Sequence, residues 1–215
     1  VKCAELVLPA GAPESAADRA ALWNAAEQAE TRKNSTVARE FEVALPDELS
    51  PAERLRLVRD LALEIVERHG CAVDVVIHAP GKKGDNRNHH AHILLSTRRL
   101  GPAGFMEKTR ELDDQKSGEV QHWRKRFASL QNERLHEAGI AASVDHRSHA
   151  ECGLLDMPGS HHGPAVNEIL RKGGSSDVAD RVAAEAAALI ARQVLDAQAA
   201  AELLEAQAAQ ALADL

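Results

Sequence analysis

The sequence predicts a single α/β or α+β domain that carries a helical extension at its C-terminal end. The length of 215 residues suits one domain of this class. With 44% hydrophobic and 27% charged residues, the composition is that of an ordinary globular protein. Runs of alternating apolar residues and segments with helical apolar spacing both occur in the chain. No apolar run approaches the ~18 residues that a membrane-spanning helix needs, so we expect no membrane insertion.

A helix over residues 15–30 and a strand over residues 37–45 are the first predicted elements. Ser15 is the expected N-cap of the helix, because an acidic residue follows it at the spacing of a capping box. In the strand, apolar and polar residues alternate, which places Glu40 and Glu42 together on the polar face. The opposite face carries Phe41, Val43 and Leu45.

The helix that follows has the clearest local signals in the chain. Ser50 is its expected N-cap, Pro51 occupies the first helical position, and Glu53 completes a capping box. Gly70 comes after the last helical residue, where glycine commonly ends a helix because it adopts left-handed backbone angles. Apolar residues at helical spacing predict the buried stripe Leu55, Val58, Leu61, Ala62 and Ile65.

Residues 72–78 and 88–97 are two strand-like runs separated by a loop with turn residues, which predicts a long β-hairpin. A further helix is expected over residues 118–138, and Gly139 is its stop signal. We interpret residues 140–176 as short pieces and loops. The residues that this helix should turn inward are Val120, Trp123, Phe127, Leu130 and Leu135.

Residues 177–215 predict a helical extension and not a second catalytic domain. Sixteen of these 39 residues are alanine and none is glycine or proline, which gives a strong helix propensity. The extension holds seven acidic and two basic residues, a net charge of −5. Residues 82–126 hold eleven basic and six acidic residues, a net charge of +5. Although the overall charge is −7, the central region is basic, which suits a nucleic-acid partner.

The histidines are the most informative side chains. His78 ends the first strand of the predicted hairpin, and His90 and His92 lie two residues apart in the second, so they share one face. If the strands pair antiparallel, His78 falls opposite that pair and the three imidazoles can converge on one ion. Imidazole is the commonest metal ligand, and three protein ligands leave coordination positions open for chemistry. His89 should point to the opposite face and is left out of the ligand set.

Acidic and basic residues near these histidines suggest further roles. Glu40 or Glu42 could accept a proton, or could orient a metal-bound histidine through its second ring nitrogen. Basic residues beside an open metal site suit a phosphodiester substrate. The basic residues expected to contact DNA are Lys82, Lys83, Arg87, Arg98 and Arg99.

Cysteine and tyrosine usage set two further expectations. The cysteines Cys3, Cys71 and Cys152 are odd in number and scattered, which favours a reducing cytosol over a disulfide framework. The chain contains no tyrosine, although it has two tryptophans and three phenylalanines. Chemistry that uses a tyrosine as nucleophile or acid therefore cannot be carried out within these residues alone.

Several of these segments together resemble plasmid mobilisation relaxases of the MobA/MobL family, and within it the conjugative-transfer relaxases of the TraA kind. The resemblance covers about residues 15–170. It implies an α+β fold in which helices flank a central antiparallel sheet, as in rolling-circle replication initiators. The matching segments are Leu22-Trp23-Asn24, residues 39–46, Ile77-His78-Ala79, His90-Ala91-His92 with Ser96, residues 144–148 and residues 158–164.

The resemblance also implies a reaction. His78, His90 and His92 would hold Mg²⁺ or Mn²⁺, which polarises the scissile phosphate of single-stranded DNA at a plasmid transfer origin. A tyrosine attacks that phosphate and leaves a 5′-phosphotyrosine link and a free 3′ hydroxyl, and the reverse reaction recloses the strand. Glu40 and Glu42 would assist proton transfer or support the ligands. The implied partners are relaxosome accessory proteins and the coupling protein of a type IV secretion system, in the bacterial cytoplasm or, with the DNA, in the recipient.

Two departures from the family's pattern bear on activity. The family has proline before the first histidine of the pair, where this chain has His89. The family's tyrosine lies in an N-terminal segment before the part that aligns here. We therefore expect residues 1–176 to be an N-terminally incomplete relaxase domain that is inactive as it stands, and residues 177–215 to be an extension or linker.

Two other interpretations stay open. The chain could be an origin-DNA-binding module that does not cut, because it lacks a tyrosine. It could also be a metallohydrolase that acts on phosphodiesters and is unrelated to conjugation, because three imidazoles suit Zn²⁺ at least as well as Mg²⁺.

Overall fold

The computed structural model describes residues 3–81, 86–149, 151–153 and 163–213. These residues fall into two compact units that divide between His146 and Arg147. The first unit holds a β-sheet with its helices, and the second holds two further helices. All the residues predicted to bind a metal belong to the first unit.

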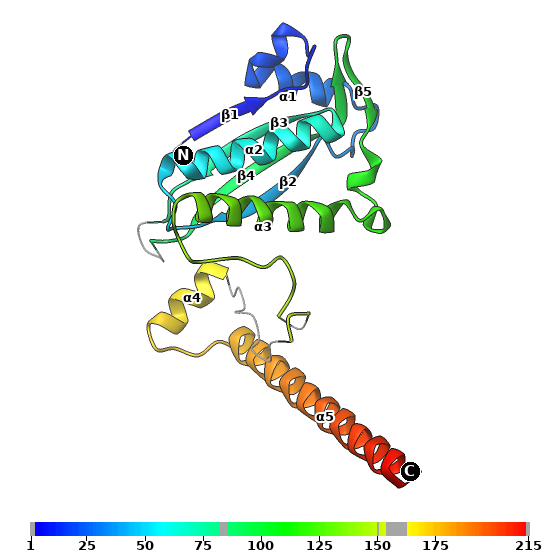
Figure 1. The fold of residues 1–215 in the computed structure, drawn as a ribbon. Coiled ribbons are helices and arrows are strands. Elements are labelled where there is room, and N and C mark those ends of the chain that lie inside the picture. Colours follow the sequence, from blue (N-terminus) through cyan, green and yellow to red (C-terminus); the bar gives the residue numbers. More distant parts are fainter. Residues whose placement is uncertain (1–2, 82–85, 150, 154–162, 214–215) are drawn as a thin grey trace. The chain divides into compact units, whose positions relative to one another are not determined.

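The first unit is built on one five-stranded sheet in which every described pairing is antiparallel (Figure 1). The strands lie in the order β1-β3-β4-β2, and β5 pairs with the far end of β4. The central antiparallel sheet that the family resemblance implied is therefore present. The strands are β1 (Cys3–Val7), β2 (Ala38–Leu45), β3 (Cys71–His78), β4 (His89–Gly101) and β5 (Gly104–Lys108).

Helices α2 (Pro51–His69) and α3 (Glu119–Glu137) cover one face of this sheet (Figure 1). Their apolar side chains pack against every second residue of the central strands, because successive strand residues point to opposite faces. Burial of this apolar surface provides the main driving force for folding. The most buried core residues include Leu57, Leu61, Ile65, Val73, Ile93 and Leu95, each at most 1% exposed.

The ends of α2 are formed as its sequence predicts. Ser50 Oγ accepts a hydrogen bond from the backbone N–H of Glu53, and Glu53 Oε2 accepts one from the backbone N–H of Ser50. Gly70 follows the last helical residue with a φ of 63°, a left-handed conformation that L residues with a side chain rarely adopt. The predicted stripe is mostly correct, although Leu57 and Val66 are also buried and Leu55 is only partly so.

Helix α1 (Arg19–Gln28) packs on the opposite face of the sheet, at one end. Leu22 of this helix is 1% exposed and belongs to a small second core with Ala72 and Leu100. Arg19 Nε and Trp23 Nε1 both donate hydrogen bonds to Asp74 Oδ2, at 2.8 and 2.9 Å. Ala72 and Asp74 alternate along β3 with the residues that face α2, so α1 and α2 lie on opposite sides of the sheet.

The structure corrects the predicted start of this first helix. The single helix expected over residues 15–30 is divided into a short 3₁₀ turn, Glu14–Ala17, and α1. Asp18 is the N-cap, because its side chain accepts a hydrogen bond from the backbone N–H of Ala21. Ser15 makes no capping bond of this kind because it lies inside the 3₁₀ turn.

Two further strands and one further α-helix were not predicted, and one residue expected to face the core does not. Strands β1 and β5 have five residues each and carry too short a pattern to stand out in the sequence. Helix α4 (Gly163–Arg171) falls within the region interpreted as loops. Val120 was expected to face the core, but it is 42% exposed in the first turn of α3, whereas Trp123, Leu130 and Leu135 are buried as predicted.

The second unit contains α4 and the long helix α5 (Asp177–Ala213). Helix α5 confirms the alanine-rich helical extension. Three of its leucines, Leu195, Leu203 and Leu204, are each more than 60% exposed. None of the helices in the described part of the chain combines the length and apolar character that would be needed to cross a membrane.

Candidate metal centre

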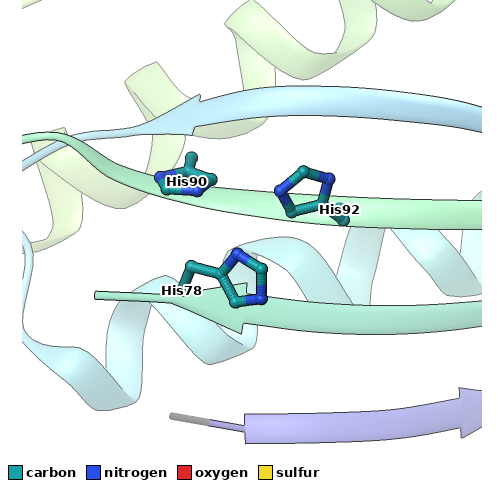
Figure 2. A group of neighbouring side chains, drawn as sticks. All are labelled: His78, His90 and His92. Carbon is teal, nitrogen blue, oxygen red and sulfur yellow. The ribbon is translucent and has the colours of Figure 1, made fainter. Parts of the chain in front are cut away.

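The three predicted histidines converge on the face of the sheet opposite to α2 and α3. In the β3–β4 ladder His78 pairs directly with His90, and His92 lies one step further along the same face. The ring centroids are 4.8–5.3 Å apart, and one ring nitrogen from each residue lies within 4.8 Å of the other two. Figure 2 shows the three rings gathered above the two neighbouring strands. The convergence expected from their spacing is therefore observed.

The second ring nitrogen of two of these histidines has a hydrogen-bond partner. Nδ1 of His92 lies 2.6 Å from Glu40 Oε1, and Nδ1 of His90 lies 3.1 Å from the backbone carbonyl oxygen of Asn88. Both partners are acceptors, so each Nδ1 carries a proton, and in the neutral ring each Nε2 presents a lone pair. Contacts of this kind orient metal-bound histidines and raise their basicity.

The electrostatic environment of His78 also favours the metal-binding form. Desolvation lowers the pKa of His78 below its ordinary value, and the neighbouring His92 and His90 lower it further. A lowered pKa keeps the imidazole neutral, which is the state that can donate a lone pair to a metal.

Glu40 and Glu42 share the face of the histidines, as predicted, but their contacts differ. Glu42 pairs with His92 across the β2–β4 ladder, whereas Glu40 pairs with Leu94. The Glu40 side chain nevertheless extends diagonally across the ladder, and its carboxylate contacts His92. The Glu42 side chain has no hydrogen bond or ion pair to any other residue described in the structure, although its charge partly opposes the lowering of the His78 pKa.

His89 faces away from the other histidines, as its strand position predicts. Its Nε2 lies 3.2 Å from Asp47 Oδ1, and its side chain borders a cavity that is also lined by Leu55 of α2. His89, which stands where the family's pattern has proline, therefore lies on the helix side of the sheet, where it does not contribute to the histidine cluster.

Of the predicted basic residues that the structure describes, Arg98 and Arg99 do not lie near the histidines. Lys82 and Lys83 lie outside the described residues, and Arg87 is exposed in the turn before β4. Arg98 Nε contacts Glu30 Oε1 at 2.8 Å, and one terminal nitrogen of Arg99 contacts Glu111 Oε1 at 2.9 Å. Both arginines lie at the end of β4 remote from His90 and His92.

Sequence reasoning missed two features of this face. The carbonyl group of Asn88 could not have been identified, because any residue supplies such an oxygen. The contacts of Asp74 with Arg19 and Trp23 join segments that are 55 and 51 residues apart. The sequence signal for this group was a single aspartate inside an apolar strand, which suggests a buried carboxylate with a partner.

The three imidazoles fit a divalent metal ion. Three neutral imidazoles, two of them with a fixed second nitrogen, can occupy three coordination positions and leave the others to a substrate or water. The same set accommodates Zn²⁺, Mn²⁺ and related ions, so the imidazoles alone do not select one metal.

Comparisons with known proteins identify the family of this chain. A family model described as MobA/MobL matches residues 1–172. The mobilization protein MobL of Acidithiobacillus ferridurans is 36% identical over 198 residues, covering 79% of this chain and 52% of the relative. The conjugal transfer protein TraA of Rhizobium radiobacter is 31% identical over 198 residues, covering 78% of this chain and 18% of the relative.

A solved structure described as "Molecular Basis of Vancomycin Resistance Transfer in Staphylococcus aureus" is also similar, with a TM-score of 0.60 and 31% identity. The match covers 68% of this chain and 75% of that one. The chain spans about half the length of MobL and less than a fifth of TraA. Since the family model matches most of the chain, this chain belongs to the MobA/MobL family.

Proposed function

We propose that this chain is the nicking domain of a plasmid mobilisation relaxase, which cuts and rejoins single-stranded DNA at a transfer origin. The observation that carries the proposal is the cluster of His78, His90 and His92 on one sheet face in a chain of the MobA/MobL family. In this proposal the relaxase domain comprises residues 1–176, and residues 177–215 are an extension or linker. The protein acts in the cytoplasm with relaxosome accessory proteins and a secretion coupling protein.

The three histidines would hold Mg²⁺ or Mn²⁺, which when bound polarises the scissile phosphate. Glu40 keeps the ring of His92 in one orientation and one tautomer through the 2.6 Å contact. Glu42 places a carboxylate without a partner among the described residues on the same face, where it can accept a proton from an attacking hydroxyl. The three DNA-contact candidates nearest the histidines in sequence are Arg87, Lys82 and Lys83.

The attacking tyrosine is not among these 215 residues, which contain none. In the proposed reaction it comes from the segment that precedes the aligned part in the family. The second candidate function is an origin-binding module that does not cut, which would need no tyrosine.

The test uses the polypeptide as it occurs in the cell, incubated with a labelled single-stranded oligonucleotide that carries the transfer origin. Mn²⁺, Mg²⁺ and Zn²⁺ are compared, with EDTA as the control. We expect metal-dependent cleavage and a covalent protein–DNA adduct on a denaturing gel. The variant His90→Ala with His92→Ala should lose cleavage, whereas His89→Ala should keep it, because His89 faces Asp47 on the other side of the sheet.

Other outcomes would replace this proposal. Cleavage without a covalent adduct, strongest with Zn²⁺, would indicate a metallohydrolase. Specific binding of the oligonucleotide without cleavage under any of the three metals would indicate the binding module. Full cleavage by the double histidine variant would contradict the metal assignment.

A further inference from the structure

A second polar site lies at the other end of the sheet from the histidines. It is a cavity of about 590 Å³ between the loop of residues 31–36 and the segments around Arg98 and Lys108. Most of its lining groups are charged or carry hydroxyls. The metal-centre proposal uses none of the residues that line it, and the sequence did not single out this loop.

The acidic groups of the cavity are already neutralised by basic residues. Glu30 has a side chain that is only 6% exposed, and it contacts Arg98 Nε and Lys108 Nζ, each at 2.8 Å. Burial would raise the pKa of Glu30, but hydrogen bonds from Arg98, Lys108 and Ser35 outweigh it and lower the pKa to about 2. Asp113 receives hydrogen bonds from Arg39 Nε and one terminal nitrogen, at 2.6 and 2.7 Å.

Two guanidinium groups remain available in the same cavity. Arg32 and Arg110 both line it and are exposed, and neither side chain has a hydrogen bond or an ion pair with any residue in the described ranges. The hydroxyl groups of Thr31 and Thr36 also line the cavity and are exposed. Since Glu30 and Asp113 have other partners, the unpaired charge of this site is positive.

We infer that this cavity binds a phosphate group of the DNA backbone, through Arg32 and Arg110. A guanidinium presents several N–H donors in a planar fork that matches phosphate oxygens, and hydroxyls are common additional phosphate contacts. The inference rests on the proposed function, because it takes the ligand to be the strand that reaches the metal centre. His92 and Arg98 are six residues apart on β4, about 20 Å at strand geometry, so one strand of several nucleotides can span both sites.

The ion-paired and the unpaired basic side chains of this cavity should have different roles. Arg98 and Lys108 form ion pairs with Glu30, which link the segments that line the cavity. Arg32 and Arg110 make no such contacts, so their replacement should change binding and leave stability unaffected. This separation makes the site testable without unfolding the protein.

The experiment measures binding of a fluorescein-labelled oligothymidylate of about 20 nucleotides by fluorescence anisotropy, at several salt concentrations and in EDTA. The variant Arg32→Ala with Arg110→Ala is compared with Lys33→Ala with Lys116→Ala. Both control residues are also exposed and do not line the cavity, and their substitution removes the same charge. Thermal unfolding of both variants checks that they fold.

We expect the arginine variant to bind about fivefold more weakly at 0.1 M salt, with a salt slope about 0.7 smaller, as for one lost phosphate contact on a single strand. The lysine variant should bind almost as the natural protein does. Equal loss in both variants would mean a general charge effect and would overturn the inference, as would an unchanged slope.

A second arm distinguishes a nucleic-acid phosphate from a free anion. Backbone amide signals of Thr31 and Thr36 are followed by NMR during titration with the oligonucleotide and with inorganic phosphate alone. Shifts at far lower concentrations of the oligonucleotide support a DNA site, whereas equal response to inorganic phosphate indicates a free-anion site and contradicts it. These measurements require neither metal nor cleavage. A negative result in the nicking assay can therefore be distinguished from a lack of phosphate binding at this cavity.

Discussion

Glu40 and His92 lie on neighbouring strands, and only 2.6 Å separates Glu40 Oε1 from Nδ1 of His92. His92 is directly opposite Glu42 in the ladder, so the contact is a diagonal one that the longer reach of Glu40 makes possible. The contact places a ring proton of His92 on Nδ1 and leaves the lone pair of Nε2 available to a metal in the neutral ring. A carboxylate that is half exposed is thereby joined to the candidate metal centre.

Glu40→Ala should weaken metal binding by about 10- to 100-fold, the usual cost of losing a hydrogen-bond partner of a ligand histidine. Isothermal titration with Mn²⁺ measures the affinity. Glu42→Ala is the matched control, because it removes the same charge from the same strand face but no hydrogen bond to a histidine. Equal losses in the two variants would show that charge, and not ligand orientation, is what Glu40 provides.

Metal affinity of the natural protein should fall as the pH drops below about 6.5, because protonated imidazole cannot bind a metal. Since the pKa of His78 is lowered, this ligand should stay available to a lower pH than an isolated histidine. Titrations with Mn²⁺ at pH 7.5 and 5.5 measure the effect. His90→Ala should remove most binding at pH 7.5, and His89→Ala should not. Affinity that is the same at both pH values would argue against imidazole ligands.

His69 should make stability depend on pH. It is 1% exposed; Trp123 Nε1 donates a hydrogen bond to its Nε2, and its Nδ1 lies 3.1 Å from Glu111 Oε1. Burial lowers the pKa of His69 although Glu111 and Glu119 oppose the shift. As the pH falls below about 6.5, the unfolded chain therefore binds a proton before the folded protein does, and stability decreases.

We expect the free energy of unfolding to decrease between pH 7.5 and 5.5, because the unfolded chain takes up a proton on His69 before the folded protein does. Urea titrations followed by tryptophan fluorescence in EDTA measure it. His69→Gln keeps a polar side chain that does not titrate, so its stability should change less with pH than that of the natural protein. The difference between the two proteins isolates His69 from the other ten histidines. Identical pH profiles would contradict the prediction.

Glu30→Gln should destabilise the protein by about 3 kcal/mol, because it leaves the partly buried Arg98 and Lys108 without their carboxylate. The free energy of unfolding at pH 7 measures this. Glu27→Gln is the control within α1, since Glu27 is exposed and has no side-chain partner among the described residues. A variant as stable as this control would show that the Glu30 cluster contributes little.

The lowered pKa of Glu30 also predicts part of the acid sensitivity. Because the folded pKa of about 2 lies below the unfolded value, the stabilisation by Glu30 is complete above about pH 4.5 and is lost as the pH falls towards 2. Glu30→Gln should therefore lose less stability than the natural protein between pH 5 and 3, by the same urea titration. A parallel loss in both proteins would assign the acid sensitivity to other carboxylates.

Local patterns in the sequence determined the features that depend on neighbouring residues. The start and end of α2 follow from Ser50, Glu53 and Gly70, whose interactions lie within one helical turn. The common face of His90 and His92 follows from the two-residue period of a strand. The separation of Glu40 and Glu42 from the apolar face of β2 has the same origin. These features needed no knowledge of the rest of the fold.

Only the tertiary structure decided which of these side chains meet. Glu40 and Glu42 are equivalent in the sequence pattern, and it is the register of β2 on β4, between residues 52 apart, that gives Glu40 the contact with His92. Arg98 and Arg99 are adjacent in sequence, but they lie on opposite faces of β4 and pair with Glu30 and Glu111. Strand register and ion pairing depend on groups that are distant in the chain, because they form only when the sheet assembles.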